Sequence, residues 1–396
     1  MDCKQIKFRP VLTFFTLTVA ALGMCAPVMA QSLDDLNIQI HGYATQGFLY
    51  TSENNIFTTH SSDGSPAWSE AVVNVTSQPI PKLRVAVQAR YFVLGNFGNS
   101  ITLDWAAADY KADDRFGVRF GKVKTPAGLF NEVQDIDPSY MWALLPQSVY
   151  PITSRNSLLA HLGGVVYGAF KLGRQAGKLE YRGWGGQRTI AHDDGYTLAQ
   201  RESGIDPVNG VTFVTEGATL RWRLPEKGIL VGASYSIANH SVSPIAAANG
   251  AVHGTQTIQQ LHEPFYFASF ERGKWMAAGE YNRLPVNGVI ALPGIGTIPL
   301  VLDLRGWYGM GSYKATDKLT LGLYHSQAFN KDAALGPPRY SKDWAISGRY
   351  DFNQYIYAKA EEHVIDGTQV GYDLQLNPTG LKPDTRLTVL KIGVSF

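Results

Sequence analysis

The segment Arg386-Leu-Thr-Val-Leu-Lys-Ile-Gly-Val-Ser-Phe396 decides the fold of this chain. Every second side chain shares one, mostly apolar, face: Thr388, Leu390, Ile392, Val394 and Phe396. Lys391 and Gly393 lie on the opposite face, and a period of two residues is that of a β-strand. If the apolar face meets lipid, the sheet must close into a barrel, because unpaired strand edges are not tolerated in hydrocarbon.

The same alternation recurs along the chain and predicts sixteen strands of roughly ten residues, the pattern of a transmembrane barrel. They cover residues 38–50, 68–78, 83–93, 101–111, 115–123, 161–171, 178–188, 211–223, 228–240, 262–272, 274–283, 301–314, 318–330, 342–352, 355–366 and 384–396. Every second connection is short. The others are mostly long, at 51–67, 124–160, 189–210, 241–261, 284–300, 331–341 and 367–383. Loop lengths sorted in this way predict an all-β fold, a closed antiparallel transmembrane β-barrel.

Charged residues on one face of these strands indicate a water-filled interior. A charge on the lipid face costs roughly 2–4 kcal/mol at the bilayer midplane, so the charged faces are expected to look inward. The inward charges carry both signs: Arg84, Arg90, Arg119, Lys359, Lys391, Asp104, Glu280, Asp303 and Glu361. Asp109 and Glu216 fall on the apolar faces of their strands, which requires a β-bulge or a place at the membrane interface.

Residues 1–30 have the pattern of a secretory signal peptide, which leaves one barrel domain over 31–396. Lys4, Lys7 and Arg9 precede a mostly apolar stretch, and Val28-Met29-Ala30 offers a cleavage site. An alternative is lipoprotein processing at Cys25. Both cysteines of the chain lie in this segment, so the rest has no disulfide scaffold, zinc thiolate site or cysteine nucleophile.

The charge balance argues against nucleic acid as a partner. The chain has 35 Lys and Arg and 33 Asp and Glu, of which three and one lie in the first thirty residues, so 32 of each sign remain. After residue 31 no apolar run approaches the roughly 20 residues of a membrane helix, so membrane insertion must be by strands.

The connection after the fifth strand is long and rich in apolar residues. It contains Phe120-Gly-Lys-Val-Lys-Thr-Pro-Ala-Gly-Leu-Phe-Asn-Glu132 and Leu145-Pro-Gln-Ser-Val-Tyr-Pro151. A long apolar connection at a barrel rim is expected to fold inside and pack on the wall. This run, at this position, resembles the Gram-negative outer-membrane porin superfamily and is similar to uncharacterised porin-like members of it.

The resemblance implies an inward-folded third outer loop that constricts a water-filled channel. It further implies a bacterial outer-membrane location, contact with outer-membrane lipid, passive diffusion of small hydrophilic solutes and ions, a homotrimer and no cofactor. The connection at 94–100 departs from the pattern because it is short, whereas in trimeric porins it often reaches a neighbouring subunit.

The resemblance also implies the site residues. The acids of the constriction loop would be Glu132, Asp135 and Asp137, and the arginines of the pore wall would be Arg90 and Arg119, with Arg182 and Arg305 as further candidates. Acids facing arginines would set a field across a narrow pore and so govern which solutes pass. The alternative is that the acids are helix caps or solvated loop charges, and that the arginines pair with strand acids such as Glu180.

Other classes of function stay open. A porin specific for anions or sugars is one, although an anion channel would require a basic excess that the inward charges do not show. A plugged structural barrel is another. An outer-membrane enzyme could combine Ser157, His161 and Asp135, but no nucleophile motif frames Ser157, so the chain is predicted not to be an enzyme.

Overall fold

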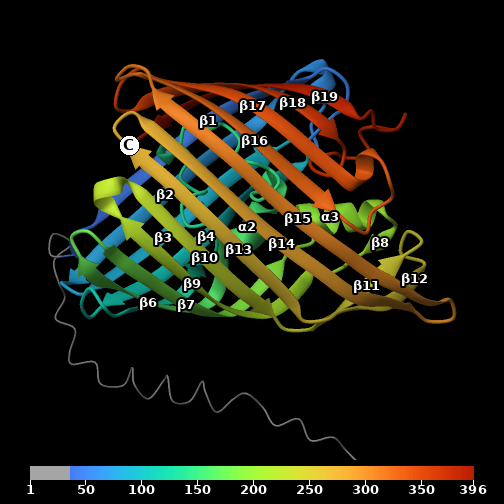
Figure 1. The fold of residues 1–396 in the computed structure, drawn as a ribbon. Helices are drawn as coiled ribbons and strands as arrows, with labels where there is room; N and C mark the ends of the chain where they lie inside the picture. The colour runs from blue at the N-terminus through green and yellow to red at the C-terminus, as the bar shows by residue number, and fades with distance from the viewer. Residues whose placement is uncertain (1–35) are drawn as a thin grey trace, which may run out of the picture.

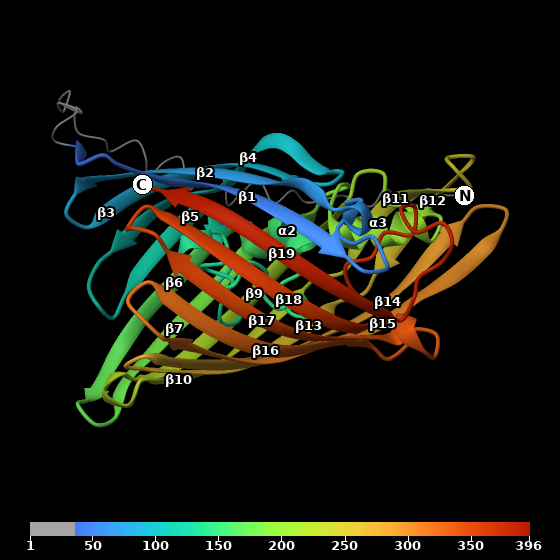
Figure 2. The same ribbon diagram turned by 90° about the horizontal axis from the view of Figure 1, so that it is seen from above.

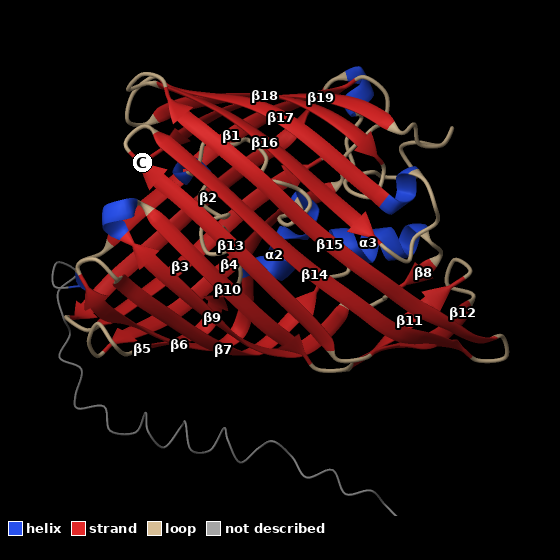
Figure 3. Cartoon of the chain, in the orientation of Figure 1, coloured by secondary structure: helices blue, strands red, loops and turns tan. Residues whose placement is uncertain are grey.

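A computed structural model describes residues 36–396, so the predicted signal peptide and Cys25 lie outside the described residues. Within this range one antiparallel sheet of nineteen strands closes on itself (Figure 1). The strands are β1 (Gln39–Thr51), β2 (Ser65–Ile80), β3 (Leu83–Leu94), β4 (Phe97–Lys111), β5 (Gly117–Lys124), β6 (Ala160–Gly173), β7 (Gly177–Ile190), β8 (Ile205–Asp206), β9 (Val211–Leu224), β10 (Ile229–Ala238), β11 (Ser241–Ala247), β12 (Val252–Ile258), β13 (Leu261–Arg272), β14 (Trp275–Leu292), β15 (Gly296–Lys314), β16 (Leu319–Asn330), β17 (Tyr340–Asp351), β18 (Ile356–Gly367) and β19 (Asp384–Ser395). The α-helices are α2 (Arg155–Leu159) and α3 (Gly195–Glu202), a small part of the molecule beside the strands (Figure 3). None of the helices described here has the length and apolarity needed to cross a membrane.

Sixteen of these strands form the closed ring, and β8, β11 and β12 extend from it. The ring closes between the two ends of the chain, where β1 pairs with β19 from Tyr43 opposite Ser395 to Thr51 opposite Leu387 (Figure 2). Phe396 and Gly42 exchange two backbone hydrogen bonds of 3.1 and 3.0 Å. The predicted sixteen-stranded antiparallel barrel is therefore confirmed, and each predicted strand has a counterpart in the ring.

The predicted long connection at 284–300 is wrong, because β14 continues to Leu292 and β15 begins at Gly296. The strand continues through Pro285, although proline cannot donate to a sheet. β14 pairs with β13 only as far as Asn282 and with β12 only from Gly288. Pro285 thus lies where one side of β14 has no neighbour. The predicted loop at 241–261 similarly contains the β11–β12 hairpin.

The two faces of the strands differ as alternation predicts. In β19, Leu390 and Ile392 are 50% and 53% exposed, whereas Lys391 between them is 4% exposed. The same division runs through the barrel, so large apolar side chains cover the exposed face and most buried charges lie on the other face. This is the reverse of a soluble protein, and it suits a barrel whose outside meets lipid and whose inside meets water.

A bulge in β4 explains one of the two misplaced acids. The register between β3 and β4 shifts between Gln88 and Ala89, and Asp104 is the residue left without an opposite partner. Beyond the shift the faces are exchanged, so that Asp109 reaches Arg119 at 3.0 Å. Glu216 has no such irregularity in the pairings of β9 described here and remains on the exposed face.

A contact between two outer loops depends on a carboxyl group. Glu202, at the end of α3, accepts a hydrogen bond of 2.8 Å from the backbone N–H of Leu374 in the connection between β18 and β19. Burial, together with the neighbouring acid Asp373, raises the pKa of Glu202 from 4.5 to about 7, although the N–H of Leu374 acts in the opposite direction.

This contact is expected to weaken as pH rises. A carboxyl group whose pKa is raised in the folded state stabilises that state fully below its ordinary pKa of 4.5, and the stabilisation is lost as pH passes about 7. Amide hydrogen exchange at 373–376, corrected for its intrinsic pH dependence, should therefore be faster at pH 8 than at pH 5. Glu202→Gln should remove this difference. Equal protection at both pH values in the unmodified chain would contradict the prediction.

Candidate functional site

The connection between β5 and β6, residues 125–159, forms an ordered unit that is closed at its base. The backbone N–H of Thr125 donates to the carbonyl of Leu159 at 2.9 Å. The side-chain amide of Asn131 donates to the carbonyls of Thr125 and Leu158 at 2.7 and 2.9 Å. The 125–159 segment is thus held at both ends by its own hydrogen bonds, so it has a defined position relative to the wall.

Apolar side chains of the 125–159 segment pack on the buried face of the strands. Met141, Trp142, Leu145, Val149 and Tyr150 form one cluster with wall residues of β10 and β13–β17. Trp142 packs edge-on against Tyr324, with ring centroids 5.2 Å apart. Burial of such a cluster fixes the segment against the wall, because each large side chain contributes about 1.5–3 kcal/mol.

Carboxylates of the wall bind backbone N–H groups of the same segment. Glu361 in β18 accepts from the N–H groups of Ala143 and Leu144 at 2.7 and 3.0 Å. Glu280 in β14 accepts from the hydroxyl of Tyr150 at 2.6 Å. These inward acids therefore replace the water that a solvated loop would bind.

Asp137 lies in a cage of two lysines. Its carboxylate is 3.0 Å from Lys359 in β18 and 2.5 Å from Lys391 in β19, and it accepts a hydrogen bond of 2.7 Å from Tyr357. Burial alone would raise the pKa of Asp137, but the two ammonium groups outweigh it and hold that pKa well below its ordinary value. Asp137 is therefore an ionised buried anchor, and it does not face Arg90 or Arg119.

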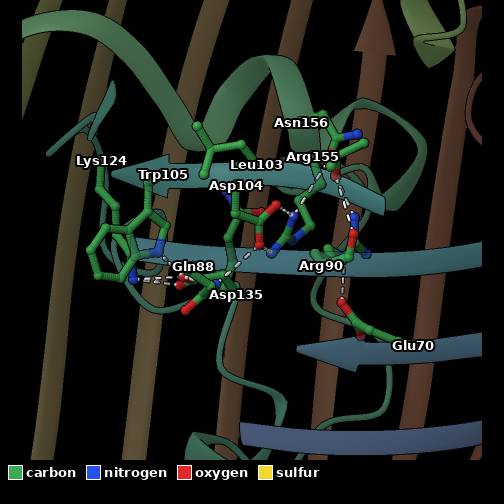
Figure 4. Close-up of polar contacts among 12 residues, drawn as sticks. Glu70, Gln88, Arg90, Leu103, Asp104, Trp105, Lys124, Asp135, Arg155 and Asn156 are labelled. Carbon is green, nitrogen blue, oxygen red and sulfur yellow. Dashed lines mark hydrogen bonds and ion pairs between the residues drawn. The ribbon is translucent and has the colours of Figure 1, made fainter. Parts of the chain in front are cut away.

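Asp135 is also fully buried and is bound by a lysine (Figure 4). Lys124 lies 2.7 Å from its carboxylate, and Gln88 and Trp105 donate to the same group at 2.8 and 3.0 Å. All the partners of this carboxylate come from β3, β4 and β5. An arginine was expected opposite Asp135, whereas the structure places Lys124 there.

Arg90 pairs with a wall acid, as the alternative interpretation of the sequence proposed for the arginines. Its Nε lies 2.5 Å from Glu70 in β2, and its Nη1 donates to Asn156 at 3.2 Å (Figure 4). The neighbouring pair of Arg155 and Asp104 is 2.8 Å apart. Arg90 is 2% exposed, so it holds the segment in place and has little contact with the lumen.

Glu132 is the one predicted acid that faces predicted arginines. Its carboxylate lies 3.9 Å from Arg119 in β5 and 3.5 Å from Arg182 in β7. A third arginine, Arg221 in β9, also lies 3.5 Å away. Arg221 was not predicted from the sequence, although it shares the inward face of its strand with Thr215 and Thr219.

Arg305 does not lie on the pore wall, so that prediction is wrong. It shares the exposed face of β15 with Trp307, opposite the buried Tyr308, and its ion pair of 2.6 Å is with Asp303, which was also predicted to face inward. Pairing of β15 with β16 ends at Leu304. Asp303 and Arg305 therefore lie at the rim of the barrel, where charges on the outer face remain in water.

A cavity of about 540 Å³ lies between the 125–159 segment and the wall strands β1–β5. Its lining includes Arg84, Trp105, Asp109, Arg119 and Glu132. The side chains of Arg119 and Glu132 are 27% and 18% exposed, so both remain open to solvent. Charges of opposite sign thus meet at a hydrated space beside the segment, which is the arrangement that can select among dissolved solutes.

The residues considered for catalysis do not form a charge-relay arrangement. The Ser157 hydroxyl donates to the carbonyl of Ser154 at 3.0 Å, and His161 Nδ1 contacts the Thr125 hydroxyl at 2.9 Å. Asp135 binds Lys124. Among residues 36–396 there is also no group of His, Cys, Asp and Glu side chains arranged to hold a metal ion.

Comparison with solved structures identifies the architecture. OmpF of Salmonella typhi, solved in complex with daunomycin, aligns with a TM-score of 0.60 at 14% sequence identity, over 93% of this chain and 100% of that one. The chain has the fold of the Gram-negative outer-membrane porins. An anion-selective porin from Comamonas acidovorans aligns with a TM-score of 0.56 at 10% identity, over 91% and 99% of the chains. The outer-membrane channel DcaP of Acinetobacter baumannii gives a TM-score of 0.53 at 11% identity, over 92% and 99%.

No protein-family model matches this chain, and no curated protein sequence matches it. The likeness therefore lies in the porin fold, and the wall and loop residues have to be interpreted from their own contacts.

Replacing Asp137 is expected to destabilise the barrel strongly. Asp137→Asn would leave Lys359 and Lys391 as buried, unbalanced charges, and breaking such a pair costs about 3–5 kcal/mol. The free energy of unfolding, from urea titration of the refolded barrel, should fall by that amount. Asp317→Asn is the control, because Asp317 lies in an exposed turn and should change stability by less than about 0.5 kcal/mol. Equal stability of the two variants would contradict the anchoring role of Asp137.

Proposed function

We propose that this chain forms a water-filled channel in the bacterial outer membrane, through which small hydrophilic solutes and ions diffuse passively. The observation that carries the proposal is the set of partly exposed, opposed charges of Glu132 and Arg119 beside the cavity. Charges in a dry interior would each cost several kcal/mol, so their exposure on the inward face favours a hydrated lumen.

We further propose that the 125–159 segment narrows this lumen. Its contacts with β3–β5, β14 and β18–β19 support a position across the interior of the barrel. In this arrangement Asp135 and Asp137 hold the segment, and Glu132 supplies a charge to the passage. Arg119 and Arg182 supply the opposite charge from the wall.

A homotrimer is proposed from the fold, because a structural neighbour, the outer-membrane protein OmpT of Vibrio cholerae, has a trimer form. The short connection between β3 and β4 offers little reach toward a neighbouring subunit, so contacts would have to come from the strands themselves. We propose that the chain is not an enzyme and needs no cofactor. Hydrolysis of phospholipid or peptide that is lost in Ser157→Ala would overturn that part.

Single-channel recording tests the channel directly. Refolded protein in a planar bilayer is expected to give discrete conductance steps, in groups of three if the homotrimer forms. A salt gradient across the bilayer would report the preference for cations or anions. Silence from correctly folded, heat-modifiable barrel would overturn the diffusion proposal and favour a plugged barrel.

Cysteine labelling tests whether Glu132 lines the passage. Residues 36–396 contain no cysteine, so Glu132→Cys introduces a single thiol into the described barrel. A charged thiosulfonate reagent added to the open channel should lower its conductance within the same recording. Glu226→Cys, in an exposed turn, is the matched control and should show no change. If Glu132→Cys is labelled and conductance stays constant, Glu132 does not line the passage.

A further inference from the structure

The arginines around Glu132 carry more positive charge than this acid can balance. The distances of Arg119, Arg182 and Arg221 to its carboxylate are 3.9, 3.5 and 3.5 Å. All three exceed the roughly 2.7–2.9 Å of a direct hydrogen bond between a cation and a carboxylate. Glu132 therefore lowers the charge of the cluster, but it does not occupy the hydrogen-bond positions of the guanidinium groups.

Two N–H groups of this cluster lack acceptors. Within residues 36–396, neither Nη1 of Arg182 nor Nε of Arg221 has a hydrogen-bond partner, and both atoms are buried. Arg221 is 7% exposed and is fixed by its Nη2, which donates to the carbonyl of Gly128 at 2.8 Å. A buried donor without an acceptor costs about 1–3 kcal/mol, so a ligand that accepts from these groups would recover that free energy.

Three other acids lie in the vicinity, and each has partners of its own. Asp109 pairs with Arg119 at 3.0 Å, and Glu180, which lies opposite Arg221 in the sheet, pairs with Lys178 at 2.6 Å and Arg223 at 3.3 Å. Glu280 accepts hydrogen bonds from the hydroxyls of Tyr150 and Tyr308 at 2.6 and 2.9 Å. Glu132 is thus the only acid of the described residues whose carboxylate lies within 4 Å of Arg182 and Arg221. The wall as a whole has both signs of charge, yet this position on β7 and β9 has a local positive excess.

The cluster can be reached by solutes. The side chains of Arg119 and Arg182 are 27% and 23% exposed, and that of Glu132 is 18% exposed. Arg119 and Glu132 also line the cavity of about 540 Å³ between the segment and the wall. Arg182 and Arg221 lie outside the lining of this cavity, so an anion in it would reach their buried free donors by displacing the side chain of Glu132.

We propose that Arg182 and Arg221, with Arg119 at the edge, bind the carboxylate group of a small organic acid. The fork of a guanidinium matches the two oxygens of a carboxylate, and Glu132 places such a group between the same arginines. The entering acid displaces the side chain of Glu132 and accepts from Nη1 of Arg182 and Nε of Arg221. The inference deepens the proposed channel function by naming a class of solute.

Calorimetric titration of the refolded protein with acetate, in a chloride-free buffer, tests the site independently of channel conductance. Acetate is expected to bind, and Arg182→Gln or Arg221→Gln should weaken binding by about tenfold or more, since each removes a charge-assisted hydrogen bond. Glu132→Gln should strengthen binding, because it removes the internal competitor. Arg223→Gln is the matched control, since Arg223 lies on the same face of β9 but is paired with Glu180, and it should leave the affinity unchanged.

Several outcomes would overturn the site. They are no binding of acetate, equal affinity in all four variants, or binding of phosphate without acetate. Arg221→Lys keeps the positive charge but removes the planar guanidinium group. An unchanged affinity for acetate in that variant would show that acetate is held only by non-specific electrostatic attraction, which would also overturn the site. Each variant must first show the heat-modifiable band of a folded barrel.

The site and the channel can fail separately. Acetate binding in a barrel that conducts no current would support the site and overturn the proposed channel. A conducting channel with no acetate binding would overturn the site and leave the channel in place.

Discussion

The pairing of β1 with β19 is the constraint on which the rest of this structure depends. In hydrocarbon each backbone N–H and C=O needs a partner within the protein, so a sheet can span only if its first and last strands meet. The two hydrogen bonds between Gly42 and Phe396 are the end of that seam. Once the sheet closes, each strand has one face toward lipid and one toward the interior, and a single-residue shift in register would exchange them.

The inward charges divide into two groups by exposure. Asp135, Asp137 and Arg90 are nearly or fully buried, and each is paired by groups on the wall or the segment. Glu132 and Arg119 keep a part of their surface in water and lie at longer distances from each other. Short, buried contacts position the 125–159 segment, whereas the longer contact of Glu132 with Arg119 is partly exposed.

The strands could be predicted from the sequence because lipid on one side and water on the other impose an alternation of apolar and polar residues. This alternation is visible within each short stretch of sequence. The site was harder to predict, because its pairs join residues far apart in the chain. Lys359 and Lys391 were expected to face inward, but nothing local indicates that both contact Asp137. Arg305 was also expected on the pore wall. Alternation gives the face of a residue only if the level of the membrane is known, and β15 passes the rim near that residue.

For Arg221 the face of the strand could be predicted, but the role of the residue could not. Its face could be read from β9, yet Arg223 two residues later has the same face and a different role, because Glu180 neutralises it. The strand pairing of β7 with β9, which brings Arg182 beside Arg221 and Glu132, is a property of the closed sheet. Residue type and periodicity are therefore enough to predict which strands carry inward charges. The ion-pair partner of each charge can be identified only from the structure.

The lysine cage of Asp137 has a consequence for the order of assembly. Both of its lysines belong to the last two strands, and Lys391 is 254 residues from Asp137 along the chain. Contacts of such long sequence separation form late, because the intervening chain must first be ordered. The 125–159 segment therefore acquires its final position only when the C-terminal strands join the ring. Arrival of the final strand thus completes the wall and the binding partners of Asp137 in one step.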